Sequence, residues 1–159
     1  MKKFIKWFFV ILVFLQAAVI IAGVVIFRMP LPDHDIDVSG LPLTDFVEVI
    51  RDERGIPHIY GTNVDDILFA QGYVHAQDRF WQLEFWSHLS TGRLASFIGE
   101  PGVGADLLFR TFGFNRVALE EYETLPPEFK QDLINYTNGI NAYIESKPQR
   151  SLSLEHFLL

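Results

Sequence analysis

Adjacent opposite charges at Asp78 and Arg79 stand inside an apolar stretch of the sequence. Apolar residues flank the pair on both sides, which predicts that the two charges are partly buried. Charges that leave water need partners: arginine offers five donors in a fixed fork, and a carboxylate accepts several hydrogen bonds. We interpret Asp78 and Arg79 as a structural polar cluster that ties neighbouring segments together, in preference to a catalytic pair.

Two further pairs of side chains have spacings that place both members on one helical face. His75 and Asp78 are three residues apart, and Glu84 and His88 are four apart. A zinc site needs a third protein ligand, and neither pair has one nearby in the sequence. We favour ordinary polar faces, with a metal-dependent hydrolase that uses His75 or His88 as the alternative that metal analysis would test.

Nucleophilic side chains have no recognisable catalytic setting in this chain. There is no cysteine and no Gly-x-Ser-x-Gly motif, and the serines lack an identifiable base or oxyanion donor. Thr62 follows Gly61 and could act as an N-terminal nucleophile if the chain were cut there. We reject that reading because the bond lies inside one expected packing unit. The sequence therefore predicts no catalytic residue, cofactor site or metal site of its own.

Charge is distributed unevenly along the 159 residues, whose net charge is −7. Residues 1–28 carry four basic and no acidic side chains, so residues 29–159 hold 9 basic and 20 acidic ones. That acidity argues against nucleic acid as a partner, since phosphate binding needs clustered basic residues. The body has the composition of a water-soluble globular domain.

The N-terminus, residues 1–28, is a candidate signal anchor. The apolar run from Trp7 to Phe27 is interrupted only by Gln16 and Gly23, and a helix of this length crosses a hydrocarbon core of about 30 Å. Lysines precede the run and aspartates follow it, so the positive-inside rule places the body on the outer, periplasmic or extracellular, face of a bacterial membrane. Cleavage within the run is the alternative, and it also exports the body.

Residues 29–45 form an expected linker between this anchor and a domain that covers residues 46–159. The linker is rich in proline and aspartate, and its acidic run at 33–37 is interpreted as solvated charge that binds no cation tightly. Next, residues 46–50 and 56–60 flank turn residues and predict a β-hairpin. Pro57 lacks an amide donor, which predicts that the second strand begins there or lies at an edge.

The rest of the body has helical periodicity. A helix is expected from about Val64 to Phe97, capped by Asn63 or Asp65, with Gly92 as a candidate end and a short turn at 94–98. Gly72 costs about 1 kcal/mol against alanine inside a helix, which predicts close approach of another backbone. Further helices are expected over 106–122 and from Thr124 to the Lys147-Pro148 pair.

Several ordered motifs resemble the N-terminal signature of the penicillin acylases, also called penicillin amidases. They are Arg51-Asp-Glu-Arg-Gly-Ile-Pro-His-Ile-Tyr-Gly61, Asp66, Ala70-Gln-Gly-Tyr-Val-His-Ala-Gln-Asp-Arg-Phe-Trp-Gln-Leu-Glu84 and Gly92-Arg-Leu-Ala95. Weaker similarities follow at Arg110, Gly113, Arg116-Val-Ala118, Leu125-Pro126 and Tyr136-Thr-Asn-Gly-Ile-Asn-Ala142. The resemblance therefore covers Val47 to Ile144.

The resemblance implies an N-terminal-nucleophile hydrolase with an αββα sandwich fold, made as a precursor that is cut into α and β chains. The nucleophile of that family is the serine that begins the β chain, and its own α-amino group, with an ordinary pKa of about 7.7–8.0, acts as base. The substrates implied are amides: acyl side chains of penicillin-like β-lactams and, in some members, acyl-homoserine lactones.

The present chain resembles only the N-terminal part of an α chain. We expect an α+β fold that consists of a transmembrane helix, a β-hairpin and a mainly helical part of the αββα sandwich. The nucleophilic serine is expected beyond Leu159, so no catalytic residue is carried over to this chain. A structural calcium ion is possible in the complete enzyme, bound mainly by residues outside this chain, and the expected partner is the remainder of the precursor.

A second hypothesis is a noncatalytic, membrane-tethered helical interaction protein derived from the same fold. Helices that are apolar on two faces need covering, and the chain offers too few strands to build a two-sheet core. This argument favours the enzyme precursor over the short interaction protein.

Overall fold

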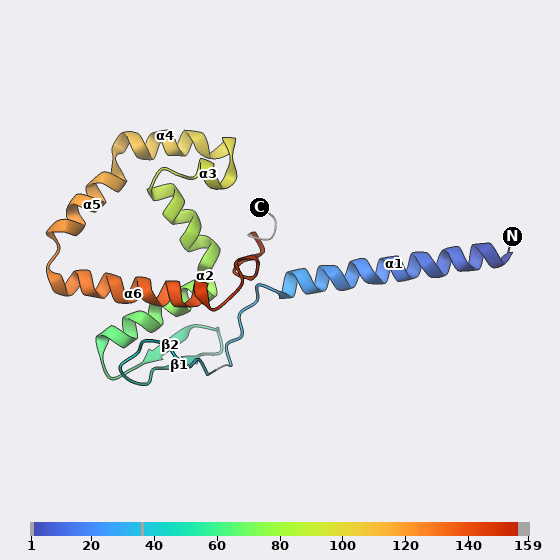
Figure 1. Ribbon diagram of the computed structural model, residues 1–159, viewed down its shortest axis with the longest axis horizontal. Coiled ribbons are helices and arrows are strands. Elements are labelled where there is room, and N and C mark those ends of the chain that lie inside the picture. Colours follow the sequence, from blue (N-terminus) through green and yellow to red (C-terminus); the bar gives the residue numbers. More distant parts are fainter. Residues whose placement is uncertain (1, 36, 156–159) are drawn as a thin grey trace.

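The structure, a computed structural model, describes residues 2–35 and 37–155 of the chain. It is mainly helical with one small sheet (Figure 1). The helices are α1 (Lys2–Arg28), α2 (Val64–Ser90), α3 (Ala95–Ile98), α4 (Val103–Phe112), α5 (Phe114–Thr124) and α6 (Pro127–Glu145), with short 3₁₀ turns η1 (Glu100–Gly102) and η2 (Gln149–Ser151). The strands are β1 (Glu48–Arg51) and β2 (Pro57–Tyr60).

Helix α1 projects away from the rest of the molecule (Figure 1). Its segment Lys6–Arg28 spans 23 residues, and the most apolar 18-residue window in it has a mean hydropathy of 3.0 and no buried residue. Length and composition therefore suit a membrane span or a signal sequence. The helix starts at Lys2, earlier than the expected Trp7, because lysine is a good helix former and nothing in residues 2–6 breaks the helix.

The hairpin forms where the alternating residues predicted it. Strands β1 and β2 pair antiparallel, with Val49 opposite Ile59, and β2 begins at Pro57 as expected. In the turn, the Asp52 carboxylate accepts hydrogen bonds of 2.9 Å from the amides of Arg54 and Ile56. These bonds, led by the one from Ile56, lower the pKa of Asp52, and they fix the register of the two strands.

Helices α2 and α6 cross with their backbones in contact (Figure 1). A side chain at Gly72 would overlap the carbonyl oxygen of Tyr136, and one at Gly139 would overlap that of Phe69. The prediction that Gly72 admits another backbone is confirmed, and Gly139 is the reciprocal residue on α6. Next to this crossing lies the core cluster, which consists of Ala76, Phe80, Tyr143 and Leu152.

One expected boundary was confirmed and two were wrong. Helix α2 ends at Ser90, next to the candidate end at Gly92, whose φ is +64°, and the short turn expected at 94–98 is α3. The helix expected over 106–122 is two helices, because Gly113 adopts a left-handed conformation with φ +73° and ψ 26°. Helix α6 begins at Pro127 and not at Thr124, since Pro126 is extended with ψ 146°.

Candidate functional site

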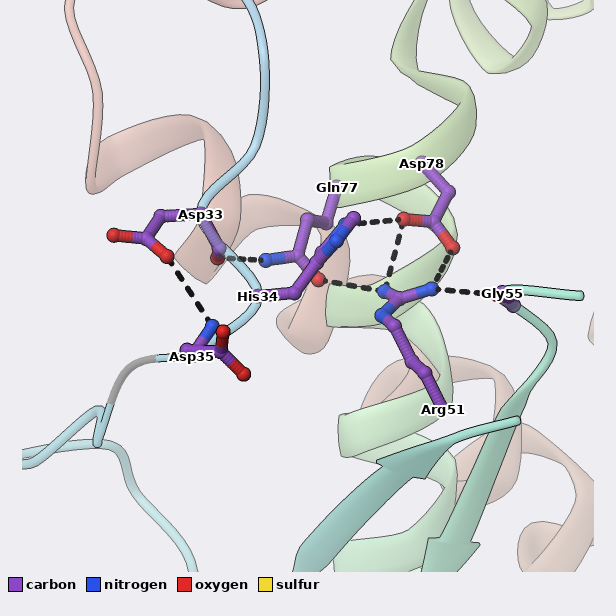
Figure 2. Close-up of polar contacts among 7 residues, drawn as sticks. All are labelled: Asp33, His34, Asp35, Arg51, Gly55, Gln77 and Asp78. Atoms are coloured by element: carbon purple, nitrogen blue, oxygen red, sulfur yellow. Dashed lines mark hydrogen bonds and ion pairs between the residues drawn. The ribbon is translucent and has the colours of Figure 1, made fainter. Parts of the chain in front are cut away.

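Asp78 lies on α2 where the helix is distorted, one residue before Arg79, whose backbone angles of φ −139° and ψ 29° are not helical. Its carboxylate forms a two-pronged ion pair with Arg51 at the end of β1 (Figure 2). The Nη1–Oδ2 distance is 2.8 Å and the Nη2–Oδ1 distance is 2.9 Å. Only 16% of the Arg51 side chain and 23% of the Asp78 side chain are exposed, so solvent screens this pair less than a surface pair.

Each Nη group of Arg51 also donates a second hydrogen bond. Nη1 donates to the carbonyl oxygen of Gly55 at 3.2 Å, and Nη2 donates to Oε1 of Gln77 at 3.0 Å. The guanidinium therefore bridges the hairpin turn and two consecutive residues of α2 (Figure 2). This arrangement uses the planar fork of arginine, which a lysine could not reproduce.

A third segment joins the cluster from residues 29–45. Nε2 of His34 lies 3.3 Å from Oδ1 of Asp78, and the Gln77 side-chain amide donates to the carbonyl oxygen of Asp33 at 3.0 Å (Figure 2). The linker has no helix or strand in its described residues, in line with its proline content. The linker is nevertheless attached to the body through Asp33 and His34. The sequence had predicted only solvated charge at 33–37, without contacts to the body.

The two residues singled out by the sequence have different surroundings. Asp78 is the centre of the polar cluster just described. Arg79 is exposed, and within the described residues its side chain makes no hydrogen bond or ion pair. The prediction that Arg79 also ties segments together therefore finds no supporting contact among the described residues. The residue that pairs with Asp78 is instead Arg51, at the end of β1 beside the hairpin turn, which the sequence pattern did not indicate.

The cluster is suited to holding segments together and not to catalysis. Both oxygens of the Asp78 carboxylate accept hydrogen bonds from Arg51, and no hydroxyl or thiol belongs to the residues drawn in Figure 2. Among the described residues, the partners of this carboxylate are Arg51 and His34, and neither carries a nucleophilic hydroxyl or thiol. These contacts agree with the interpretation of the cluster as structural, which stays a prediction.

The side chains weighed as metal ligands have separate partners. Nδ1 of His75 lies 2.8 Å from the Tyr136 hydroxyl, while Asp78 pairs with Arg51. Nδ1 of His88 lies 3.0 Å from the backbone oxygen of Glu84. Across residues 2–35 and 37–155, no group of three or more histidine, cysteine or acidic side chains is placed to hold a metal ion.

Two buried carboxylates organise the chain away from this cluster. Asp66 is 4% exposed and accepts hydrogen bonds from the amides of Thr44 at 3.0 Å and Asp45 at 2.9 Å. Asn63 caps α2, as one of the two expected caps, and its side-chain amide also donates to Asp66. The Thr44 amide, followed by Asn63, lowers the pKa of Asp66, so this carboxylate stays ionised.

The second buried carboxylate, Asp106 on α4, is 8% exposed. It accepts hydrogen bonds from the amides of Leu94 at 2.6 Å and Ala95 at 2.9 Å, which caps the start of α3. Arg110, one turn later, donates to the carbonyl oxygen of Gly92 at 2.6 Å. The sequence did not predict the hydrogen-bonding role of either aspartate, because the amides that they bind are distant in the sequence.

Thr62, the rejected nucleophile candidate, donates its hydroxyl hydrogen to Oδ2 of Asp45 at 2.8 Å. The preceding Gly61 packs so closely that a side chain there would come within 2.9 Å of Ile67. Helix α2 begins two residues after Thr62. The bond between Gly61 and Thr62 therefore lies inside a packed connection between the hairpin and α2.

Comparison with known proteins places these features in a family. The family model described as penicillin amidase matches residues 46–159, which include the hairpin, both buried aspartates and the Arg51–Asp78 pair. The chain belongs to the penicillin amidase family. The resemblance predicted from the ordered motifs is thus confirmed.

Curated relatives in the penicillin amidase family are much longer than this chain. The penicillin acylase 2 proenzyme of a Pseudomonas species is 40% identical over 100 residues, which cover 63% of this chain and 13% of that protein. The acyl-homoserine lactone acylase QuiP of Pseudomonas fluorescens is 36% identical over 102 residues, or 64% of this chain and 13% of that protein. The chain therefore spans about an eighth of the length of the curated relatives that it matches.

A solved structure shares part of this fold. The thermostable penicillin G acylase from Alcaligenes faecalis superposes with a TM-score of 0.58 at 27% identity. The superposition covers 64% of this chain and 54% of the matched chain. The superposed part of this chain thus shares the fold of that penicillin G acylase.

Proposed function

We propose that this chain is the N-terminal part of an exported amidohydrolase precursor of the penicillin amidase family. The complete protein would cleave linear amides, either the acyl side chains of penicillin-like β-lactams or acyl-homoserine lactones. The observation that carries the proposal is the family match over residues 46–159. Relatives whose names specify both substrate classes support it.

In the proposed reaction, the serine that begins the β chain attacks the amide carbonyl carbon. Its free α-amino group accepts the hydroxyl proton and returns it to the nitrogen of the leaving amine as the carbon–nitrogen bond breaks. Water then attacks the resulting ester, which releases the carboxylic acid and regenerates the serine. This chain supplies none of the reacting groups in the proposal; its role is scaffold, and we expect it to be inactive alone.

Exposed apolar side chains on α4 and α5 support the idea that the rest of the precursor is the partner of this chain. Leu107 is 69% exposed, Phe112 62% and Leu119 60%. Helix α5 has no buried residue, and Asp106 is the buried residue of α4. Apolar faces of this kind mark surfaces that another part of a protein covers. We propose that later segments of the precursor build the αββα sandwich against them.

Helix α1 would keep the enzyme at the membrane. At about 1.5 Å per residue, the 23 residues of Lys6–Arg28 extend about 34 Å, enough to cross a bilayer. Three lysines lie before or at the start of this segment and aspartates follow it, which supports an uncleaved signal anchor with the body on the outer face. A cleaved signal sequence would export the same body without the anchor.

Expression of the complete gene with its own export signal tests the proposal. Mass spectrometry of the cell envelope should find a processed pair of chains, and the preparation should hydrolyse penicillin G or an acyl-homoserine lactone. Replacing the serine found at the new N-terminus with alanine should abolish both events. A stable, unprocessed species of 18.3 kDa without amidase activity would instead support the noncatalytic interaction protein.

A further inference from the structure

Residues 30–35 lie outside the family match, which begins at residue 46, yet they contact residues inside it. The Gln77 side-chain amide donates to the carbonyl oxygen of Asp33 at 3.0 Å, and His34 reaches the Asp78 carboxylate at 3.3 Å. Figure 2 shows both contacts on the same side of α2. We call residues 30–35 the strap, and the pairs Asp33–Gln77 and His34–Asp78 the latch.

The latch has a rigid base. Gln77 and Asp78 are both held by the Arg51 guanidinium, through contacts of 3.0 Å to Gln77 and 2.8 and 2.9 Å to Asp78. The partners of the strap are therefore positioned before the strap reaches them. A preorganised pair of partners lowers the entropic cost of ordering the strap.

A second attachment holds the other end of the linker. The amides of Thr44 and Asp45 donate to the buried carboxylate of Asp66. The linker is thus fixed to the body near its start and at its end. Residues between a membrane helix and a domain usually act as a flexible spacer, and this one is attached at two points.

The latch changes how far the body can move from α1. An extended linker of 17 residues, 29–45, would reach about 60 Å at about 3.5 Å per residue. With Asp33 fixed to Gln77, the free tether is residues 29–32, which reach about 14 Å. Pro30 and Pro32 stiffen this short piece and line a cavity of about 300 Å³ beside α2.

We propose that the strap holds the enzyme body against the outer surface of the lipid bilayer, with the latch as its attachment to α2. This inference rests on the proposed function of α1 as an uncleaved anchor. The body, with 20 acidic and 9 basic side chains, gains no attraction from anionic headgroups. Proximity to the bilayer must then come from the short tether and not from surface charge.

Limited proteolysis of the complete gene product in nanodiscs tests the latch. A protease that cuts before aspartate is added, and cleavage before Asp33 and Asp35 is followed by mass spectrometry. Cleavage of a docked segment requires local opening, so its rate reports the population of the open strap. His34→Ala should speed cleavage at these two bonds about threefold, and His34→Ala with Gln77→Ala about tenfold.

His58→Ala is the matched control. His58 is also a partly exposed histidine beside a carboxylate, 3.7 Å from Asp52, but it lies on the hairpin and outside the latch. It should leave cleavage before Asp33 and Asp35 unchanged. Rapid cleavage of the parent protein before Asp33 and Asp35, or equal cleavage rates in the parent and the double variant, would contradict the proposed latch.

Neutron reflectometry on a supported bilayer tests the position of the body. The parent body should lie directly on the headgroups, and the double variant should move away from them. Equal positions would overturn the role of the strap at the membrane. A protein that leaves the bilayer with its strap still protected would show that the anchor proposal fails while the latch stands.

Discussion

Two regions of the molecule are both helical and both rich in apolar side chains, but their packing differs. In the crossing unit, which we define as the hairpin, residues 64–80 of α2, and α6, Ala76 is fully buried and Tyr143 is 1% exposed. In the outer arm, which we define as α4 and α5, side chains such as Leu107 and Phe112 are more than half exposed. An apolar helix face thus predicts a packing surface. Whether that face is buried depends on which other segment packs against it.

The backbone explains the difference. In the crossing unit, Gly72 and Gly139 have no side chains, so the backbones of α2 and α6 lie in direct contact. The outer arm has Gly104, at which a side chain would meet nothing within 4 Å. The crossing unit is completed by its own chain, and we propose that another segment covers the outer arm.

The largest expected effect comes from closing the space at the helix crossing. Gly72→Ala should destabilise the complete protein by about 3 kcal/mol or more, because the added methyl group overlaps backbone that cannot move without separating α2 from α6. Gly104→Ala on α4 is the matched control and should stabilise by up to about 1 kcal/mol through helix propensity. Urea denaturation followed by circular dichroism measures both, and equal effects would contradict the account of the crossing.

The outer arm should respond to mutation only when its partner is present. Leu107→Ala should cost about 2 kcal/mol in the complete protein, where we propose that Leu107 is covered, and less than about 0.5 kcal/mol in residues 29–159 alone. Thermal unfolding of the two forms provides the comparison. A small effect in both forms would mean that the outer arm faces solvent in the enzyme.

The ion pair in the crossing unit should couple more strongly than an exposed pair in the outer arm. A double-mutant cycle with Arg51→Met and Asp78→Asn should give a coupling of about 1–2 kcal/mol, because the pair is two-pronged and its side chains are only 16% and 23% exposed. The control cycle on Arg116 and Glu120, whose side chains are 69% and 63% exposed, should give about 0.3–0.5 kcal/mol. Equal couplings would show that the Asp78 cluster is ordinary surface charge.

The smallest expected effect is on the stability of the fold at acidic pH. The folded-state pKa of Asp66 lies below its ordinary value of 3.8, so its ionised form stabilises the fold above that value, and this stability is lost as the pH falls through the folded pKa. Unfolding midpoints measured between about pH 6 and about pH 3 should therefore fall less steeply in Asp66→Asn than in the parent. Parallel curves would indicate that Thr44 and Asp45 do not bind this carboxylate.

Local patterns allowed much of the crossing unit to be predicted. The turn residues at 52–55 predicted the hairpin, and Gly72 predicted a backbone contact. The break at Gly113 was missed because the apolar residues on either side of it continue the helical period. Arg51 and Asp66 were missed as organising residues because their partners, Asp78 and the Thr44 and Asp45 amides, are more than 20 residues away in the sequence.

Hydrogen exchange of α4 and α5 in the complete protein tests most directly whether the outer arm is covered by the rest of a penicillin amidase precursor. We expect their amides to exchange as slowly as those of α2 and α6, because covered helices open only with the surrounding structure. Exchange within seconds along α4 and α5, beside slow exchange in α2 and α6, would contradict the claim.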